Sequence, residues 1–325
     1  MKQMLWSYLT GLGLDKVQTA RDLRILPLLA TKQDPFQYVS LSSAISERTL
    51  IITEVSEAGS VPNLKAINEG ALPVLLLDGE EVRGAKQNRI LNTSVLLDAK
   101  TQLIIPVSCT ESGRWNYHGR QCDESENFLS GKMRSSKMTR VNDSLKENRG
   151  YDAGQSDVWH EIQLMSREHN ANSPTNAMAD VFAHAGKSLA ELCEHFPLLE
   201  GQCGIYVEID GKFAGMDILS LPSVWKDVHD KIIRSYAIEV IKQADPEPEE
   251  RDLNPDAVFA LISDARETSR PAIGLGVDTR LEGKQITGSV LSMGESFVHT
   301  AIYPVLPKAY RENYSSPRQR RVYIY

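Results

Sequence analysis

Residues 72–117 read LPVLLLDGEEVRGAKQNRILNTSVLLDAKTQLIIPVSCTESGRWNY. In this stretch, short aliphatic runs alternate with glycine, asparagine, aspartate and serine, a pattern that predicts β-strands separated by turns. The predicted strands cover residues 73–77, 90–97 and 103–108. The Asp78-Gly79 step predicts a tight turn, because glycine tolerates the positive φ that a primed hairpin turn requires.

The segments on either side of this stretch differ in hydrophobic period. Strands are predicted at residues 23–29 and 49–55, and residues 65–70 are predicted as a short helical turn or loop. Downstream, apolar residues recur at helical spacing after Asp157 and after Asn176, which predicts two helices, the second ending at Pro197. The N-terminal half is therefore predicted to be β-rich and the centre helical.

The C-terminal part returns to strand patterns. A hairpin is predicted at residues 205–209 and 213–219, and two helices are predicted to begin near Ser223 and at Asn254-Pro255. An acidic, proline-rich connector at residues 244–250 separates these helices. An antiparallel meander is predicted at residues 272–281, 285–292 and 295–303. Because strands and helices do not alternate regularly, the order predicts an α+β fold rather than a doubly wound parallel sheet.

Residues 110–156 are dominated by Ser, Asn, Gly, Arg and Lys, and apolar periodicity disappears there. So long a stretch without predicted secondary structure indicates a polar loop that is mobile or functional. We predict one α+β domain over residues 1–307, with the loop as the place of any subdivision. A basic, tyrosine-rich tail over residues 308–325 follows, and it is a candidate contact for a protein partner.

Composition excludes several classes of protein. The 325 residues include 36 Lys plus Arg and 43 Asp plus Glu, which gives a formal net charge of −7. This charge argues against non-specific binding of nucleic acid by the protein surface as a whole. No run approaches the roughly 18 apolar residues of a membrane helix, and the run at residues 4–14 lacks a signal-peptide cleavage site. The four cysteines form no zinc-binding spacing. We expect a cytoplasmic protein with free thiols, no metal site and no membrane contact.

A first polar cluster lies between two predicted strands, within residues 80–89. Lys86 supplies a point charge and Arg89 paired donors, while Gln87 and Asn88 supply amide groups. These groups suit a phosphate or a carboxylate. The alternative is a solvated hairpin end with no ligand.

A second polar cluster follows the strand at residues 103–108. Glu111 is a candidate general base or acceptor for a ribose hydroxyl, Arg114 is a further cation, and Trp115 is a candidate stacking surface for a base. Cys109 is a less favoured nucleophile, because no histidine is nearby in sequence and a free cysteine usually packs as a small hydrophobe. An antiparallel strand pair would bring the two clusters to the same edge of a sheet.

Asp217 and His299 are two further candidates for acid–base chemistry. Asp217 has apolar neighbours in its predicted strand, so its carboxylate must be hydrogen-bonded or lie at a cleft. His299 alternates with apolar residues in the last predicted strand, and the alternative role is a partly buried core histidine. The pair Gly274-x-Gly276 precedes a strand and lacks a third glycine, so it is not a dinucleotide fingerprint, and no cofactor can be named.

Residues 72–117 resemble the family called the ARG and rhodanese-phosphatase-superfamily-associated protein domain. Weaker support comes from QSDVW at residues 155–159, GQCGIYVEIDGKFAGMDIL at 201–219 and RSYA at 234–237, so the resemblance covers roughly residues 20–306. The family name records an association with ADP-ribosylglycohydrolases. The resemblance therefore implies a link to ADP-ribose or NAD-derived nucleotides, with no mechanism to transfer.

The leading hypothesis is a site for an ADP-ribose-like or other phosphorylated nucleotide. Lys86 and Arg89 contact phosphate, Asn88 or Gln87 orients the ligand, and Trp115 stacks on the base. Glu111 or Asp217 binds ribose or acts as acid or base, with His299 as a further catalytic candidate. Whether the protein is a hydrolase or a binding module stays open. The alternative is a non-catalytic interaction protein that docks a partner enzyme through a flat face rather than a pocket.

Overall fold

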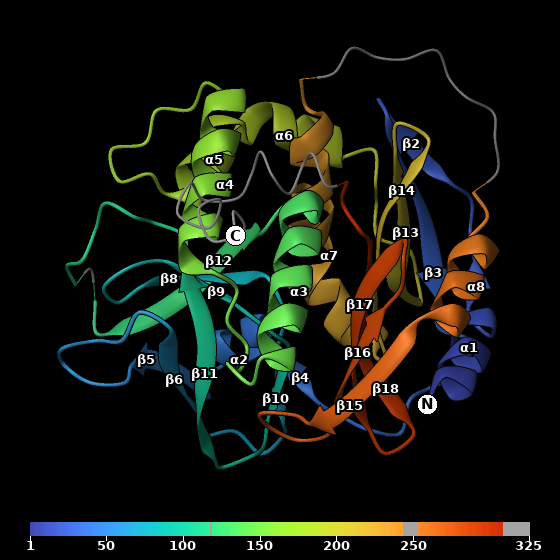
Figure 1. Cartoon of the computed structure of the whole chain (residues 1–325), viewed down its shortest axis with the longest axis horizontal. Helices are drawn as coiled ribbons and strands as arrows, with labels where there is room; N and C mark the ends of the chain where they lie inside the picture. The colour runs from blue at the N-terminus through green and yellow to red at the C-terminus, as the bar shows by residue number, and fades with distance from the viewer. Residues whose placement is uncertain (118, 243–252, 308–325) are drawn as a thin grey trace, which may run out of the picture.

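The computed structural model describes residues 1–117, 119–242 and 253–307. It contains a large antiparallel sheet, a closed barrel and a small third sheet, with two long helices between the barrel and the large sheet (Figure 1). The fold is α+β, as predicted, with a β-rich N-terminal half, central helices and an antiparallel C-terminal sheet. The predicted connector at residues 244–250 and the tail at 308–325 lie outside the described residues.

The large sheet combines strands from both ends of the chain. In spatial order it contains β1 (Gly13–Leu14), β3 (Leu23–Leu29), β13 (Gln202–Ile209), β14 (Lys212–Leu219), β18 (Ser296–Pro304), β17 (Ile286–Met293), β16 (Val277–Glu282) and β15 (Arg266–Pro271), and β2 (Gln18–Ala20) also pairs with β3. The predicted hairpin is confirmed, because Ile209 pairs with Lys212 across Asp210-Gly211. Both turn residues have positive φ, 52° and 66°, as a type I′ turn requires.

The barrel contains six strands around an aliphatic interior. Its members are β5 (Leu50–Glu54), β6 (Asn63–Asn68), β8 (Glu80–Gly84), β9 (Arg89–Leu91), β11 (Gln102–Cys109) and β12 (Gln121–Phe128). A small sheet lies beside it, formed by β4 (Val39–Ser40), β7 (Val74–Leu76) and β10 (Val95–Leu97). Six short strands enclose only enough space for side chains, so a ligand has to bind at an end or outside the barrel.

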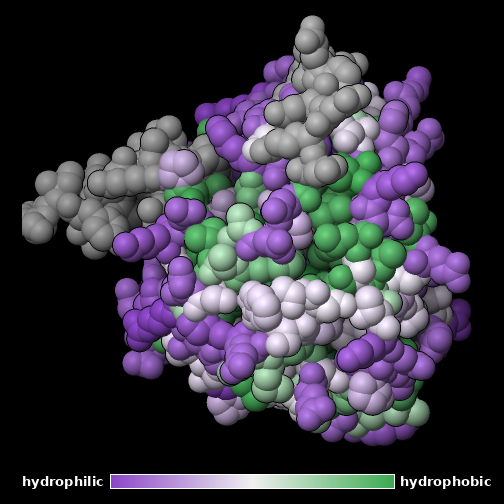
Figure 2. Space-filling view, turned by 90° about the vertical axis from the view of Figure 1, so that its right-hand side faces the viewer, coloured by the Kyte–Doolittle hydropathy of each residue, from purple (hydrophilic) through white to green (hydrophobic). Residues whose placement is uncertain are grey.

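Helices cover both faces of the large sheet. The helices α3 (Gly131–Lys146) and α7 (Pro222–Val240) lie between the barrel and the large sheet. The shorter helices on this side of the large sheet are α2 (Leu41–Ser46), α4 (Gln155–Glu168), α5 (Met178–His184) and α6 (Gly186–Cys193). The helices α1 (Lys2–Thr10) and α8 (Asp256–Asp264) pack on the other face of the large sheet, and Figure 2 shows hydrophobic residues gathered between polar ones on that side of the molecule. Of the helices described, none combines the length and the apolar character of a membrane span.

Several predicted elements are wrong in detail. Residues 65–70 lie mostly in strand β6, and the predicted strand at 90–97 is two strands, β9 and β10, in different sheets. The Asp78-Gly79 turn exists, with Gly79 at φ 84°, but it connects β7 and β8 of different sheets rather than a hairpin. The single helix predicted after Asn176 is divided into two helices, α5 and α6. Short aliphatic runs show no sign of where the chain leaves one sheet for another.

The predicted polar loop at residues 110–156 is the largest error, because it contains β12 and the sixteen-residue helix α3. Eleven residues of α3 are buried although most of its residues are polar. The buried polar side chains find distant partners: Ser136 donates to Glu161 at 2.6 Å, and Asn142 donates to Thr287 at 3.1 Å. Since polar groups occupy the buried face, hydrophobic periodicity cannot reveal this helix.

One apolar cluster connects the two halves of the molecule. It contains Leu75 and Ile90 from the barrel side, Ile205 and Val207 from the large sheet, and Trp225 from α7. A shared core is typical of a single domain. The single-domain organisation over residues 1–307 itself stays a prediction.

Candidate functional site

The two polar clusters predicted from the sequence lie side by side at one end of the barrel. Strand β9 pairs with β11, with Arg89 opposite Cys109. Just beyond the pair, the Thr110 amide donates to the Asn88 carbonyl at 2.9 Å, and the Asn88 amide donates to Glu111 Oε2 at 3.5 Å. We call this end the barrel mouth; it comprises Glu54, residues 58–60, residues 85–89 and residues 111–117.

Arg89 lies beneath the barrel mouth and is fully buried. Its Nη2 is 3.4 Å from Glu54 Oε1, and its Nη1 donates to the Gln87 carbonyl at 3.0 Å. Glu54 also accepts the Lys86 amide at 3.2 Å. The ion pair thus fixes the turn that carries the polar residues 85–88.

Arg114 and Glu111 form a second ion pair, with Nη2 and Oε2 2.7 Å apart. Arg114 also donates to Asn88 Oδ1 and to the Ala85 carbonyl, each at 3.2 Å. Burial raises the pKa of Glu111, but hydrogen bonds from Arg114 and Thr175 outweigh burial and leave the pKa below its ordinary value. Glu111 is therefore ionised at neutral pH and acts as an acceptor rather than a proton donor.

Lys86 is buried in the mouth, 8% exposed, and lies against two aromatic rings. Its Nζ is 5.4 Å from the ring centroid of Trp115 and 5.0 Å from that of Tyr117, and it donates to the Ala58 carbonyl at 2.7 Å. Trp115 is 41% exposed and Tyr117 is 48% exposed. Sequence reasoning selected Lys86 and Trp115 but missed Tyr117 and Glu54. The aromatic spacing of Trp115 and Tyr117 was a usable signal, whereas nothing local marked Glu54.

The structure does not bring Asp217 and His299 to the barrel mouth. Asp217 lies on β14 and accepts from Arg134 Nη1 at 2.8 and 2.9 Å and from the hydroxyls of Tyr236 and Tyr303, each at 2.9 Å. His299 lies on the neighbouring strand β18, with its Nε2 4.0 Å from Asp217 Oδ1. Of the three predicted catalytic residues, Asp217 and His299 therefore lie together in one buried cluster, whereas Glu111 lies at the barrel mouth.

This buried cluster extends along α3 and holds the barrel to the large sheet. Lys137 pairs with Asp78 and donates to the carbonyls of Leu91 and Asn92, each at 3.3 Å. Arg280 lies 2.9 Å from Asp278. We call this set of ionisable side chains the buried joint; it comprises Asp78, Arg134, Lys137, Asp217, Asp278, Arg280 and His299, none more than 4% exposed.

His299 is neutral within the joint. Its Nδ1 is 2.7 Å from Ser94 Oγ. Burial lowers the pKa of His299 to about 4, and nearby Asp217 offsets only part of this effect. A neutral imidazole at physiological pH suits a structural acceptor or donor in a network that already holds the guanidinium groups of Arg134 and Arg280.

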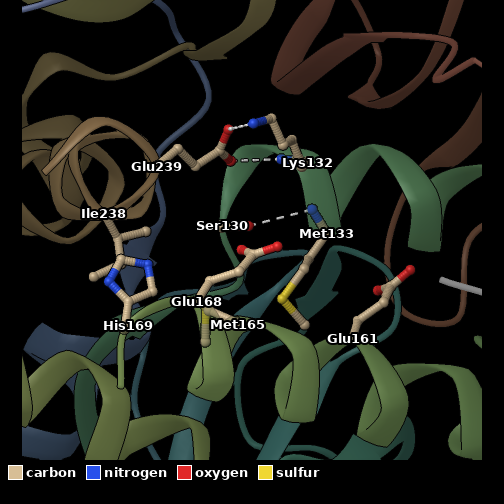
Figure 3. Close-up of a pocket in the computed structure, with 9 residues that line it drawn as sticks. All are labelled: Ser130, Lys132, Met133, Glu161, Met165, Glu168, His169, Ile238 and Glu239. Carbon is tan, nitrogen blue, oxygen red and sulfur yellow. Dashed lines mark hydrogen bonds and ion pairs between the residues drawn. The ribbon is translucent and has the colours of Figure 1, made fainter. Parts of the chain in front are cut away.

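Two hollows accompany these clusters. The smaller, of about 100 Å³, lies between α3, α4 and α7 and is lined by Glu161, Glu168 and Glu239 (Figure 3). Glu239 accepts the Lys132 amide at 2.7 Å, and Glu161 is 2.8 Å from Arg140. This hollow is below the 300 Å³ or so of a typical small-molecule pocket. The larger hollow, of about 330 Å³, lies beside β11 next to the barrel mouth.

Metal-ligating side chains and cysteines are the remaining groups of chemical interest. Within residues 1–117, 119–242 and 253–307, no group of three or more His, Cys, Asp or Glu side chains is placed to hold a metal ion. All four cysteines are free. Burial raises the pKa of Cys109 to about 11, so this side chain is a protonated thiol at neutral pH and a weak nucleophile.

Comparison with known proteins identifies the family. The family model described as the ARG and Rhodanese-Phosphatase-superfamily-associated Protein domain matches residues 11–303, and the chain belongs to this family. The match includes the barrel mouth, the buried joint and both hollows. Comparison with curated proteins and with solved structures gives no significant match.

Proposed function

We propose that this protein binds a phosphorylated nucleotide, of the ADP-ribose or NAD-derived class, at the barrel mouth. The observation that carries the proposal is the position of Lys86, whose ammonium group lies against two half-exposed aromatic rings. An aromatic face next to a cation suits a ligand that has both a flat base and a phosphate. The family name, through its link to ADP-ribosylglycohydrolases, favours the same ligand class.

The electrostatics of the mouth favour an anion. Lys86, Arg89 and Arg114 supply three positive charges, and Glu54 and Glu111 supply two negative charges. Within the part of the chain that the structure describes, Lys86 donates one N–H to the Ala58 carbonyl, and its ammonium group has two further donors for a phosphate. The Nε of Arg89 is buried and has no hydrogen-bond partner among the described residues. Because the side chain is fully buried, Arg89 contributes its charge to the mouth rather than a direct contact to a ligand.

Each remaining group has a role in this proposal. Trp115 stacks on the base, and the ionised Glu111 accepts from a ribose hydroxyl. Asn88 and Gln87 hold the arginines: Asn88 accepts from Arg114 through its side chain and Gln87 accepts from Arg89 through its carbonyl. We assign Asp217 and His299 to the buried joint, because Asp217 already accepts four hydrogen bonds there.

Binding is tested by titration calorimetry with ADP-ribose and AMP. Trp115→Ala is expected to weaken binding by about 1–3 kcal/mol, the contribution of one base–aromatic stack. Lys86→Ala is expected to weaken it by about 1.5–3 kcal/mol through loss of a charged hydrogen bond. The matched controls are Trp6→Ala, at a tryptophan 45% exposed on α1, and Lys187→Ala, at a lysine whose side chain is 90% exposed.

The outcome also separates this proposal from the interaction-protein alternative. Binding that is lost in the two mouth variants and kept in both controls supports a ligand site. If neither ligand binds the wild-type protein, the proposal fails, and the exposed Trp115 and Tyr117 are better explained as contacts for a protein partner.

A further inference from the structure

The 330 Å³ cavity lies immediately beside the barrel mouth, on the other side of the same loop. The Ser60 carbonyl accepts from Arg89 Nη2 at 3.4 Å in the mouth. Pro62 and Asn63 line the cavity. Since two residues of extended chain span at most about 7 Å, the edge of the mouth at Ser60 lies within that distance of the edge of the cavity at Pro62.

Strand β11 connects the two places a second time. Ser108, near the end of this strand, lines the cavity. Thr110, two residues later, donates its amide to the Asn88 carbonyl in the mouth. The mouth and the cavity therefore adjoin along the same strand.

The cavity differs from the mouth in its chemistry. Its inner wall is apolar at Val107 and Pro106 and polar but uncharged at Asn92 and Ser108. Ser108 Oγ donates to Asn92 Oδ1 at 2.9 Å and remains an acceptor, and both side chains are 3% exposed. A wall of this kind accepts hydroxyl groups and ring faces and provides nothing to neutralise a phosphate.

The open side of the cavity is formed by the segment between α3 and α4. Gln155 holds this segment to the barrel, because its side-chain amide donates to the Cys109 carbonyl at 2.9 Å and accepts the Cys109 amide at 2.7 Å. Arg149 and Asp152, 3.5 Å apart, form an exposed ion pair at the rim. The charged groups of the cavity thus neutralise each other at the rim, away from the buried wall.

We propose that this cavity is a second subsite, which takes the uncharged ribosyl half of a two-part nucleotide whose phosphates lie at the barrel mouth. This inference rests on the proposed function and specifies its ligand: a molecule of ADP-ribose length rather than a mononucleotide. The volume of about 330 Å³ suits a sugar or nucleoside group.

The test compares ADP-ribose with ADP, which has both phosphates but no second ribose, on the wild-type protein and on two variants that fill the cavity. One or two additional hydrogen bonds from the ribosyl half predict that ADP-ribose binds about tenfold more tightly than ADP. Val61→Trp fills the cavity from a residue that is 39% exposed, and Asp152→Trp fills it from the rim. Val277→Trp, at a valine that is 41% exposed and is not part of the cavity lining, is the control.

In both cavity variants, ADP-ribose is expected to bind only as tightly as ADP, while ADP binding and the thermal unfolding midpoint stay unchanged. An unchanged preference for ADP-ribose in both variants overturns the second subsite and leaves the mouth site standing. Equal affinity for the two ligands in the wild-type protein overturns it as well. Failure of both ligands to bind the wild-type protein overturns the proposed function itself, and the second subsite with it.

Discussion

Replacing Arg134 by leucine is expected to lower the free energy of unfolding by about 3–5 kcal/mol, the usual effect of removing one partner from a buried ion pair. Arg134 is 1% exposed and donates to Asp217, Tyr303 and Ser235. Without it, Asp217 remains buried between two tyrosine hydroxyls with no cation to compensate its charge. Urea unfolding followed by circular dichroism measures the loss.

Lys146→Ala on the same helix provides the comparison. Lys146 forms ion pairs with Asp143 and Glu282, but its side chain is 48% exposed, so we expect a loss of at most about 1 kcal/mol. Similar small losses in the two variants would show that the buried joint stabilises the fold no more than a surface ion pair does.

The buried joint is also expected to make the protein sensitive to acid. Burial lowers the pKa of His299 from 6.5 to about 4, so between these values the unfolded chain binds a proton that the folded protein does not. Stability is therefore complete above pH 6.5 and is lost as the pH falls towards 4, by about 3 kcal/mol for this group alone. Asp217 on β14, Arg134 and Lys137 on α3, and Arg280 on β16 are the charged groups that face it.

A His299→Gln variant isolates this effect, because glutamine keeps a polar group beside Ser94 and does not titrate. Urea unfolding at pH 7 and at pH 4.5 gives the pH dependence of each protein. The variant is expected to lose less stability than the wild-type protein between these two pH values. An identical pH dependence would mean that His299 does not remain neutral in the folded protein.

Local sequence patterns were sufficient for a part of the fold. The hairpin at Asp210-Gly211 and the C-terminal meander were predictable, because two-residue turns and alternating apolar residues are local signals. Helix α3 was not, since Arg134 and Lys137 face the interior and their acidic partners lie 83 and 59 residues away. Burial of a charged side chain depends on partners that lie outside any short segment of sequence around it.

The candidate site was predictable to a similar extent. The clusters at residues 86–89 and 111–115 were selected for their chemistry, and their proximity followed from antiparallel pairing. Glu54 could not be selected, because only the closure of the barrel brings it to Arg89. Asp217 and His299 lie in buried strands, as predicted. They do not lie with Glu111, because β14 and β18 belong to the large sheet whereas Glu111 follows β11 of the barrel.

The most direct test of nucleotide binding at the barrel mouth is fluorine NMR of protein labelled with 5-fluorotryptophan. The chain has four tryptophans, and the signal of Trp115 is assigned by its absence from the Trp115→Phe variant. On titration with ADP-ribose, the Trp115 signal is expected to shift and saturate, while the signals of Trp6 on α1 and Trp225 in the core stay in place. An unmoved Trp115 signal at saturating ADP-ribose would contradict the proposed site.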